Sequence, residues 1–207
     1  QDRPEVALLA DILGLSMLVT ALQQRKPKGC TEATAVTALG VQRAPRSNDE
    51  PAPDEPCYVQ GRVRTLDGTP IAGAEVRIGP SERDGRQQRL TSGSDGRFLH
   101  ETVVAAPSVV AGDGPVARLL HALGRHAWRP AHLNFIISSP GYERLATQVF
   151  RREDPYLDSD AVFGVRASLV ADWVRHARGR TPDGRSSDAP FTTLDFDFVL
   201  NVKTGDK

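Results

Sequence analysis

The sequence predicts a mainly β protein, a β-sandwich with a helical segment at its N-terminus. Apolar and polar residues alternate over residues 59–65 and again over residues 193–200, as in strands with one buried face. Asp-Gly pairs beginning at Asp67 and Asp95 mark turns between strands. Several short strands separated by turn residues are typical of a sandwich.

The N-terminal segment is predicted to form one helix. Asp2 can cap this helix, Pro4 suits its first turn, and Glu5 complements its dipole. Apolar residues between Val6 and Leu22 cover more than one face, and the sequence after residue 25, Lys-Pro-Lys-Gly, ends the helix. A helix that is apolar on several sides needs cover from other elements. We therefore expect a homodimer formed through this helix.

Composition excludes several classes of partner. The chain has 207 residues, and its 26 basic and 26 acidic side chains cancel, which argues against binding to nucleic acid or an anionic membrane. The N-terminal apolar run is shorter than a membrane span and contains Asp11, and it lacks the marks of a signal peptide. We expect a cytoplasmic protein. Two cysteines, Cys30 and Cys57, are too few for a disulfide framework or a thiolate metal cage.

The chain divides into three predicted regions. Residues 1–40 form the helical dimerisation segment, residues 41–56 form a linker with four prolines, and residues 57–207 form a β-sandwich domain of catalytic type. Further strands are predicted at residues 71–78, 97–99, 133–138, 145–150 and 194–202, and short helices at residues 115–123 and 161–169.

Four motifs carry a resemblance to a known family. They are GRHAWRPAHLNF at residues 124–135, SPGY at 139–142, DPYLDSDAV at 154–162 and TLDFDFVL at 193–200. In this order they resemble the intradiol ring-cleavage dioxygenases, closest to the hydroxyquinol and catechol 1,2-dioxygenase branch. The N-terminal helix and residues 31–34 resemble the end of that family's helical dimerisation region. The resemblance implies the family's β-sandwich and dimer.

The same resemblance implies a ferric ion held by two tyrosines and two histidines. The first histidine matches His132, but Asn134 stands at the second histidine and Ser108 at one tyrosine. No tyrosine follows the strand that ends at Ile78, where the other ligand is expected. The chain has three tyrosines, and all of them belong to other motifs or strands. Hydroxyl and amide oxygens are weak donors for Fe(III), so the sequence predicts that the ferric site is lost and that no metal or other cofactor is used.

Five residues are predicted to form the site. The resemblance places Arg129 and Gln148 beside the substrate, and His132, Asn134 and Ser108 around the former metal cavity. His132 is a candidate general acid or base and Arg129 a candidate stabiliser of an enolate or carboxylate, with buried structural roles as the alternatives. Asn134, Gln148 and Ser108 are candidates for substrate binding. Small apolar residues between Val103 and Ala111 are expected to leave an open pocket for a small molecule.

Three functions stay open on the sequence. The favoured one is a metal-independent enzyme of secondary metabolism, which cyclises, dehydrates or isomerises a phenolic or polyketide-like molecule by proton transfer. The second is a catechol- or hydroxyquinol-type ring-cleavage dioxygenase with an unusual metal site. The third is a non-catalytic small-molecule binder or partner subunit. The carboxylates of Asp158 and Asp160 are interpreted as a structural turn and cap.

Overall fold

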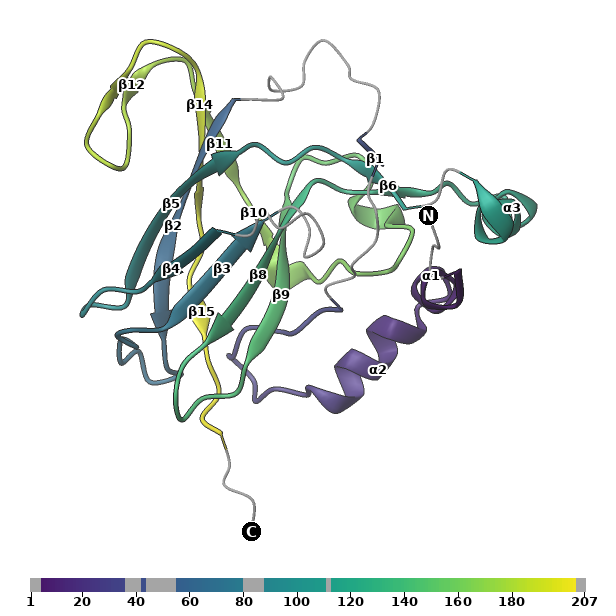
Figure 1. Ribbon diagram of the computed structural model, residues 1–207, viewed down its shortest axis with the longest axis horizontal. Helices are drawn as coiled ribbons and strands as arrows, with labels where there is room; N and C mark the ends of the chain where they lie inside the picture. The colour runs from purple at the N-terminus through teal and green to yellow at the C-terminus, as the bar shows by residue number, and fades with distance from the viewer. Residues whose placement is uncertain (1–4, 36–41, 44–54, 80–87, 111–112, 204–207) are drawn as a thin grey trace.

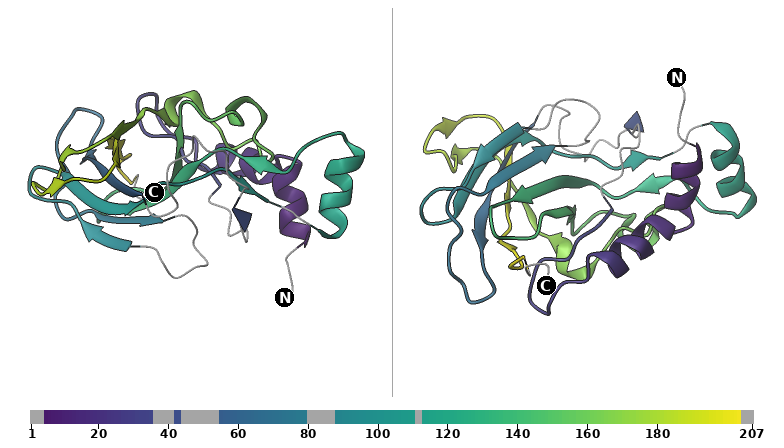
Figure 2. Two further views of the ribbon diagram at one scale, coloured as in Figure 1. Left: turned by 90° about the horizontal axis from the view of Figure 1, so that it is seen from above. Right: turned by 60° about the horizontal axis from the view of Figure 1, so that its bottom comes forward.

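Two β-sheets pack face to face, and the three short α-helices of the described residues gather at one end of the molecule (Figure 1). This computed structural model describes residues 5–35, 42–43, 55–79, 88–110 and 113–203. Figure 2 shows the helices at the end opposite the hairpin β12–β13, which comprises Gly179–Arg180 and Ser186–Ser187. The mainly β fold with N-terminal helices is therefore confirmed.

The first sheet carries two of the strands on which the candidate site is built. Its order is β10 (Val170–Ala171), β9 (Leu145–Arg151), β8 (His132–Ser138), β3 (Glu75–Gly79) and β4 (Gln88–Thr91). β8 lies in the middle and is antiparallel to both β9 and β3. All residues of β8 but its last are buried, as expected for a central strand covered on both faces.

The second sheet is organised around β2 (Pro56–Arg64). β5 (Arg97–Val103) pairs with one edge of β2 in antiparallel register. On the other edge β2 is parallel to β14 (Phe191–Asp195) and then to β15 (Phe198–Val199), and β11 (Trp173–His176) completes the sheet beside β14. The core between the two sheets includes the fully buried side chains of Val59, Val63, Val76, Phe135 and Leu194.

A small third sheet supports the candidate site. Its strands are β1 (Gln42–Arg43), β6 (Ser108–Val109) and β7 (Trp128–Arg129). The antiparallel pairing of β6 with β7 places Ser108 opposite Arg129. Residues 80–87 and 111–112, which include the end of the Val103–Ala111 stretch, lie outside the described residues.

The N-terminal segment forms two helices where the sequence predicts one. α1 (Glu5–Ile12) and α2 (Leu15–Gln23) are separated at Gly14, whose φ of 76° is left-handed. The predicted end before Lys26 is confirmed, whereas Asp2 and Pro4 lie outside the described residues. No single described helix is long and apolar enough to cross a membrane, although the α1–α2 pair reaches that length across its 76° bend.

The short helix at residues 115–123 is confirmed, but the helix at residues 161–169 is wrong. α3 spans Gly114–Ala122. Residues 161–166 form a loop, and one 3-10 turn, Ala167–Leu169, follows it. The helix does not form because the Asp160 carboxylate accepts the N–H groups of Val162 and Gly164, and because Phe163 has a left-handed φ of 58°.

Two predicted strands are shorter than the sequence pattern suggests. Residues 71–74 precede β3, which begins at Glu75. The predicted strand at residues 194–202 is split between β14 and β15, because the chain bulges at Phe196 and Asp197. The Phe196 carbonyl lies over Gly61 of β2, where a Cβ would stand only 1.9 Å from that oxygen. The strands predicted at residues 97–99, 133–138 and 145–150 are confirmed.

Residues 26–35 bind the helical end to the sandwich. Lys26 forms an ion pair with Glu143, just before β9. The Thr31 N–H donates to the Val199 carbonyl, and the Thr34 N–H donates to the Ala146 carbonyl. This segment therefore joins both sheets at their edges.

Candidate functional site

Arg129 is the centre of a buried polar cluster. It is the last residue of β7 and its side chain is 2% exposed. The side chain occupies this position because β7 is fixed on one side by β6 and because the Ala161 N–H donates to the Trp128 carbonyl at 3.0 Å. A guanidinium group buried to this degree requires a counter-charge.

Asp160 supplies the counter-charge. Arg129 Nε donates to Asp160 Oδ1 at 3.0 Å, and Nη2 donates to Oδ2 at 3.2 Å, so the pair is bidentate. Burial alone would raise the pKa of Asp160, but the charge and hydrogen bonds of Arg129 hold that pKa below its usual value. The carboxylate therefore stays ionised and holds the guanidinium in one orientation.

Gln148 and Asn134 extend the cluster across the first sheet. They face each other on β9 and β8 in the antiparallel register. Arg129 Nη2 donates to Gln148 Oε1 at 3.0 Å, and Gln148 Nε2 donates to Asn134 Oδ1 at 2.9 Å. Since an arginine can only donate, its bond fixes which way the Gln148 amide is turned.

His132 lies at the start of β8, against the remaining edge of Arg129. Its Nδ1 is 2.7 Å from the Pro130 carbonyl, which can only accept, so the proton lies on Nδ1 and Nε2 keeps its lone pair. Arg129 Nη1 is 3.4 Å from that Nε2. Burial and the Arg129 charge lower the pKa of His132 to about 3, so the imidazole is neutral at physiological pH.

Arg129 keeps one donor for a ligand. Arg129 uses Nε and both N–H groups of Nη2 for Asp160 and Gln148, and one N–H of Nη1 faces His132. The second N–H of Nη1 makes no hydrogen bond to the described residues. Such a donor, held rigidly in a buried site, can bind a hydroxyl or carboxylate oxygen of a ligand.

Ser108 is buried opposite Arg129 on β6, so the structure brings it next to Arg129. Its neighbours toward the N-terminus, Ala105 and Ala106, are half-buried, and Val104 is buried. The open pocket expected along this stretch stays a prediction. The roles of all five residues, Arg129, His132, Asn134, Gln148 and Ser108, are likewise predictions.

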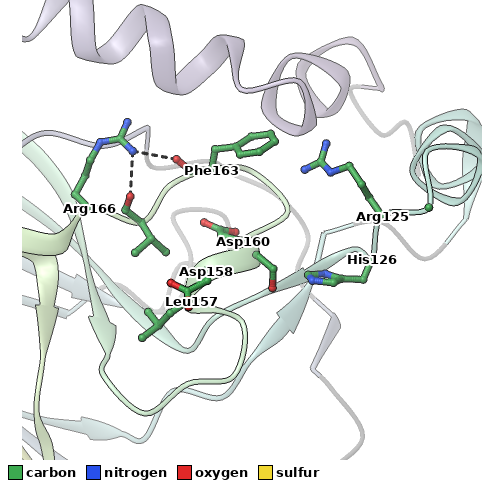
Figure 3. A pocket seen from close by; sticks show the side chains of 10 residues that line it. Arg125, His126, Leu157, Asp158, Asp160, Phe163 and Arg166 are labelled. Carbon is green, nitrogen blue, oxygen red and sulfur yellow. Dashed lines mark hydrogen bonds between the residues drawn. The ribbon is translucent and has the colours of Figure 1, made fainter.

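A pocket of about 520 Å³ reaches the cluster from the helical end (Figure 3). It touches the cluster at Asp160, and Arg125, His126, Phe163 and Arg166 contribute to its wall. Asp11 of α1 is a buried carboxyl that is not part of the pocket wall. Burial raises its pKa, while a Ser16 hydrogen bond and the Arg129 charge oppose that rise. The helical end therefore forms part of the electrostatic environment of Arg129.

The comparisons with known proteins identify the family. Residues 33–202 match the family described as Dioxygenase. The chain is 49% identical to a 6-chlorohydroxyquinol 1,2-dioxygenase of Cupriavidus pinatubonensis, over 96% of this chain and 75% of the relative. It is 37% identical to a hydroxyquinol 1,2-dioxygenase of Rhizobium sp., over 96% of this chain and 74% of the relative.

Solved structures agree with this assignment. The crystal structure of hydroxyquinol 1,2-dioxygenase from Pseudomonas putida DLL-E4 has a TM-score of 0.83 and 34% identity, covering 97% of this chain and 77% of that one. Catechol 1,2-dioxygenase from Pseudomonas arvilla C-1 has a TM-score of 0.80 and 29% identity, with coverage of 97% and 73%. The chain belongs to the intradiol ring-cleavage dioxygenase family.

These relatives correct two predictions made from the sequence. The prediction of a metal-independent cyclase, dehydratase or isomerase is wrong, because relatives with up to 49% identity over most of the chain are named as ring-cleaving dioxygenases. The prediction that no cofactor is used is wrong for the same reason, because the family depends on non-haem Fe(III). The chain differs from the family at three ligand positions, but the similarity of the remaining chain to named dioxygenases is the stronger indication of its class.

The donor atoms on this chain still differ from the two-tyrosine, two-histidine set that the resemblance implies. His132 is a neutral imidazole and suits a metal ion, but Asn134 Oδ1 already accepts from Gln148, and Ser108 offers a hydroxyl. The three tyrosines lie elsewhere: Tyr58 packs edge-on against Phe191, Tyr142 pairs with Val202, and Tyr156 stacks on Trp128. The described residues thus do not reproduce the family's ferric ligand set.

Two residues of the site are absent from the predicted set. The sequence suggests a cap and turn residue at Asp160, but its main role in the fold is to hold Arg129. In the sequence, Asp160 is one carboxylate within a motif that the family shares. No sequence pattern links it to Arg129, which is 31 residues away. Arg125 escapes prediction because its hydrogen bonds go to backbone carbonyls and leave no pattern in the sequence.

Proposed function

We propose that the protein is a ring-cleaving dioxygenase that acts on an aromatic diol of the hydroxyquinol type. The observation that carries the proposal is the 49% identity, over 96% of the chain, to a protein named 6-chlorohydroxyquinol 1,2-dioxygenase. The buried cluster supports it, because Arg129 offers one fixed donor to an oxygen of a small ring. The overall reaction joins one diol to one O₂ and yields one dicarboxylic acid, so it needs no further oxidant.

The chain's own residues bind and orient the substrate. Asp160 and Gln148 hold Arg129 so that its unused Nη1 N–H points in one direction, and this donor binds an oxygen of the ring. His132 is neutral, so Nε2 carries a lone pair without first losing a proton. That lone pair faces Arg129 Nη1 at 3.4 Å, so a metal ion bound at Nε2 would have to displace this contact. The donor set differs from the family's, so the metal site is part of the proposal, and the iron content of the loaded protein tests it.

The test is oxygen consumption by the purified protein after anaerobic loading with iron. Hydroxyquinol, chlorohydroxyquinol and catechol serve as substrates, and mass spectrometry after reaction with ¹⁸O₂ follows both oxygen atoms into the dicarboxylate. Metal analysis of the loaded protein gives the iron content. Arg129→Gln should lower turnover, while Arg118→Gln on the exposed side of α3 serves as the matched control.

The outcome separates the proposal from its alternative. Stoichiometric dicarboxylate containing two labelled oxygens supports a dioxygenase. Binding of the diols without oxygen uptake, with or without iron, would overturn the proposal. In that case the protein would be a binder built on the dioxygenase fold.

The homodimer and the cytoplasmic location expected from the sequence also remain proposals. Exposed apolar side chains on α1, on α2 and in the turn between them support the dimer; they are Val6, Leu13, Leu15, Leu18, Val19 and Leu22.

A further inference from the structure

The loop of residues 160–164, here called the Asp160 loop, determines where Arg129 lies. The Asp160 carboxylate accepts N–H groups from Val162 at 3.3 Å and from Gly164 at 2.8 Å, so the loop curls around the carboxylate. The same carboxylate holds Arg129 by two hydrogen bonds. Any change in the shape of the loop therefore changes the position of Asp160 and, through it, of the guanidinium.

The Asp160 loop has a conformation that its sequence alone does not favour. Phe163 has a φ of 58°, the only left-handed non-glycine residue among those described. A bulky residue adopts this region rarely, and such a conformation persists when its surroundings hold it. The Phe163 ring is also half exposed, so burial of the ring does not explain it.

Arg125 holds the Asp160 loop in this conformation. Its Nη2 donates to the Ala161 carbonyl at 2.9 Å, and its guanidinium carbon lies 4.5 Å from the centre of the Phe163 ring. Its Nη1 donates to the Ile12 carbonyl at 2.7 Å, at the end of α1 where no helical N–H remains to bond it. Figure 3 shows Arg125 and Phe163 side by side next to Asp160.

The N-terminal helices complete the support of the loop. A Cβ at Gly14, between α1 and α2, would lie 3.2 Å from the Phe163 ring. A Cβ at Gly164 would lie 3.1 Å from the Met17 methyl group of α2. Arg125 is the one side chain among the described residues that hydrogen-bonds both α1 and the Asp160 loop.

We propose that Arg125 is a positioning residue for the ring-cleavage site, acting on Arg129 through the Asp160 loop. Its side-chain hydrogen bonds to the described residues go to Ile12 and Ala161 and not to the five predicted site residues. It fixes the loop, the loop fixes Asp160, and Asp160 aims the unused N–H of Arg129. This inference rests on the proposed function, and it implies that the helical end contributes to the orientation of the substrate.

The first arm of the test does not require turnover. In ¹⁵N-labelled protein the ring nitrogens of His132 report its environment, because Nε2 faces Arg129 Nη1. Arg125→Ala should shift or broaden the Nε2 signal while circular dichroism still shows a cooperative thermal transition. The matched control is Arg118→Ala on the exposed face of α3, which should leave the signal unchanged.

The second arm uses the diol assay. Arg125→Ala should lower kcat/KM about tenfold to a hundredfold, the size expected when a group that orients substrate is displaced. Arg125→Lys should recover part of the loss, because one ammonium group can replace one of the two carbonyl contacts. Phe163→Asn in the Arg125→Ala background should also recover part of it, because asparagine tolerates the left-handed conformation better.

The positioning role and the proposed function can fail separately. If Arg125→Ala is folded and both the His132 signal and the kinetic constants match the wild type, the positioning role is overturned. If Arg125→Ala does not fold, Arg125→Met carries the same test with the same two outcomes, because methionine keeps most of the side-chain volume and cannot donate to either carbonyl. If the wild type shows no turnover, the proposed function fails, and the His132 signal still decides whether Arg125 positions the cluster.

Discussion

Gly164 lies so close to Arg129 that a Cβ on the glycine would stand 2.8 Å from the arginine Nη2 and 3.0 Å from Asp160 Oδ2. The absence of a side chain at residue 164 therefore gives the buried ion pair its space. α2 closes the same space from the other side with Met17. The site thus tolerates no additional atom at the point where loop, helix and arginine meet.

We expect Gly164→Ala to destabilise the protein by about 1–3 kcal/mol, the usual cost of forcing an extra methyl group into a packed site. Urea unfolding measures the loss. Gly93→Ala is the control, because its nearest neighbour, 3.2 Å away, is the carboxylate of the exposed Asp95 and not a buried ion pair. Equal stability of the two variants would contradict the close packing around Gly164.

Asp160→Asn should destabilise the protein more strongly, by about 3–5 kcal/mol, because it leaves the buried Arg129 charge without a counter-ion. The amide is nearly the same size as the carboxylate, so packing changes little. Asp158→Asn is the matched control, since Asp158 is exposed two residues earlier. Chemical denaturation at neutral pH should give a clearly lower free energy of unfolding for Asp160→Asn than for Asp158→Asn. A small loss of stability in Asp160→Asn would show that another group offsets the buried charge of Arg129.

Stability should depend on pH through the ion pair of Lys26 with Glu143. The hydrogen bond and charge of Lys26 lower the pKa of Glu143 from its ordinary 4.5. The folded state therefore binds its proton less tightly than the unfolded state, so the stabilisation is present above pH 4.5 and is lost as pH falls through the lowered pKa.

Glu143→Gln tests this dependence. The variant should be less stable than the wild type near neutral pH, and the difference should shrink on acidification below pH 4.5. Urea midpoints over a pH series measure it. If the difference in stability between the two proteins stays constant with pH, the ionisation of Glu143 does not contribute to the stability of the folded state.

The two cysteines should be slow to react in the folded protein. Burial raises the pKa of Cys57 to about 12, and burial also raises the pKa of the half-buried Cys30 thiol. Thiolate is the reactive form, so little of it exists at neutral pH. With a thiol reagent we expect Cys30 to react slowly and Cys57 only after unfolding. Rapid labelling of Cys57 in native protein would contradict its burial in the core.

The exposed apolar face of α1 and α2 should be a dimer interface. Leu18 and Leu22 of α2 are 55% and 71% exposed, and such side chains gain stability when a partner covers them. Sedimentation should give a dimer at micromolar concentration for the wild type and a monomer for Leu22→Asp. Val174→Asp, at an equally apolar exposed position on β11, should remain dimeric. If the wild type is a monomer at this concentration, the proposed dimer is wrong.

The period-two pattern is sufficient to predict the strands that have one buried face and an unbroken register. It fails where tertiary contacts change the backbone. The alternation at residues 194–200 continues through Phe196, yet the strand breaks there because the Phe196 carbonyl lies over Gly61 on another strand. The helix expected at residues 161–169 is lost to hydrogen bonds with the Asp160 side chain.

Four of the five predicted site residues form one hydrogen-bonded cluster, because Asn134 and His132 share a face of β8 and Gln148 faces Asn134 across the sheet. Spacing along a strand determines such relationships, so sequence can predict them. The pairing of Arg129 with Asp160 depends on how a distant loop folds back.

The parallel pairing of β2 with β14 and β15 has a consequence for the synthesis of the protein. β2 joins residues 57–60 to residues 192–195 and residues 63–64 to residues 198–199, so its neighbour is made more than a hundred residues later. Until then one edge of a central strand has no partner and can pair with another nascent chain. Growth temperature and chaperone supply during expression should therefore affect the yield of this protein.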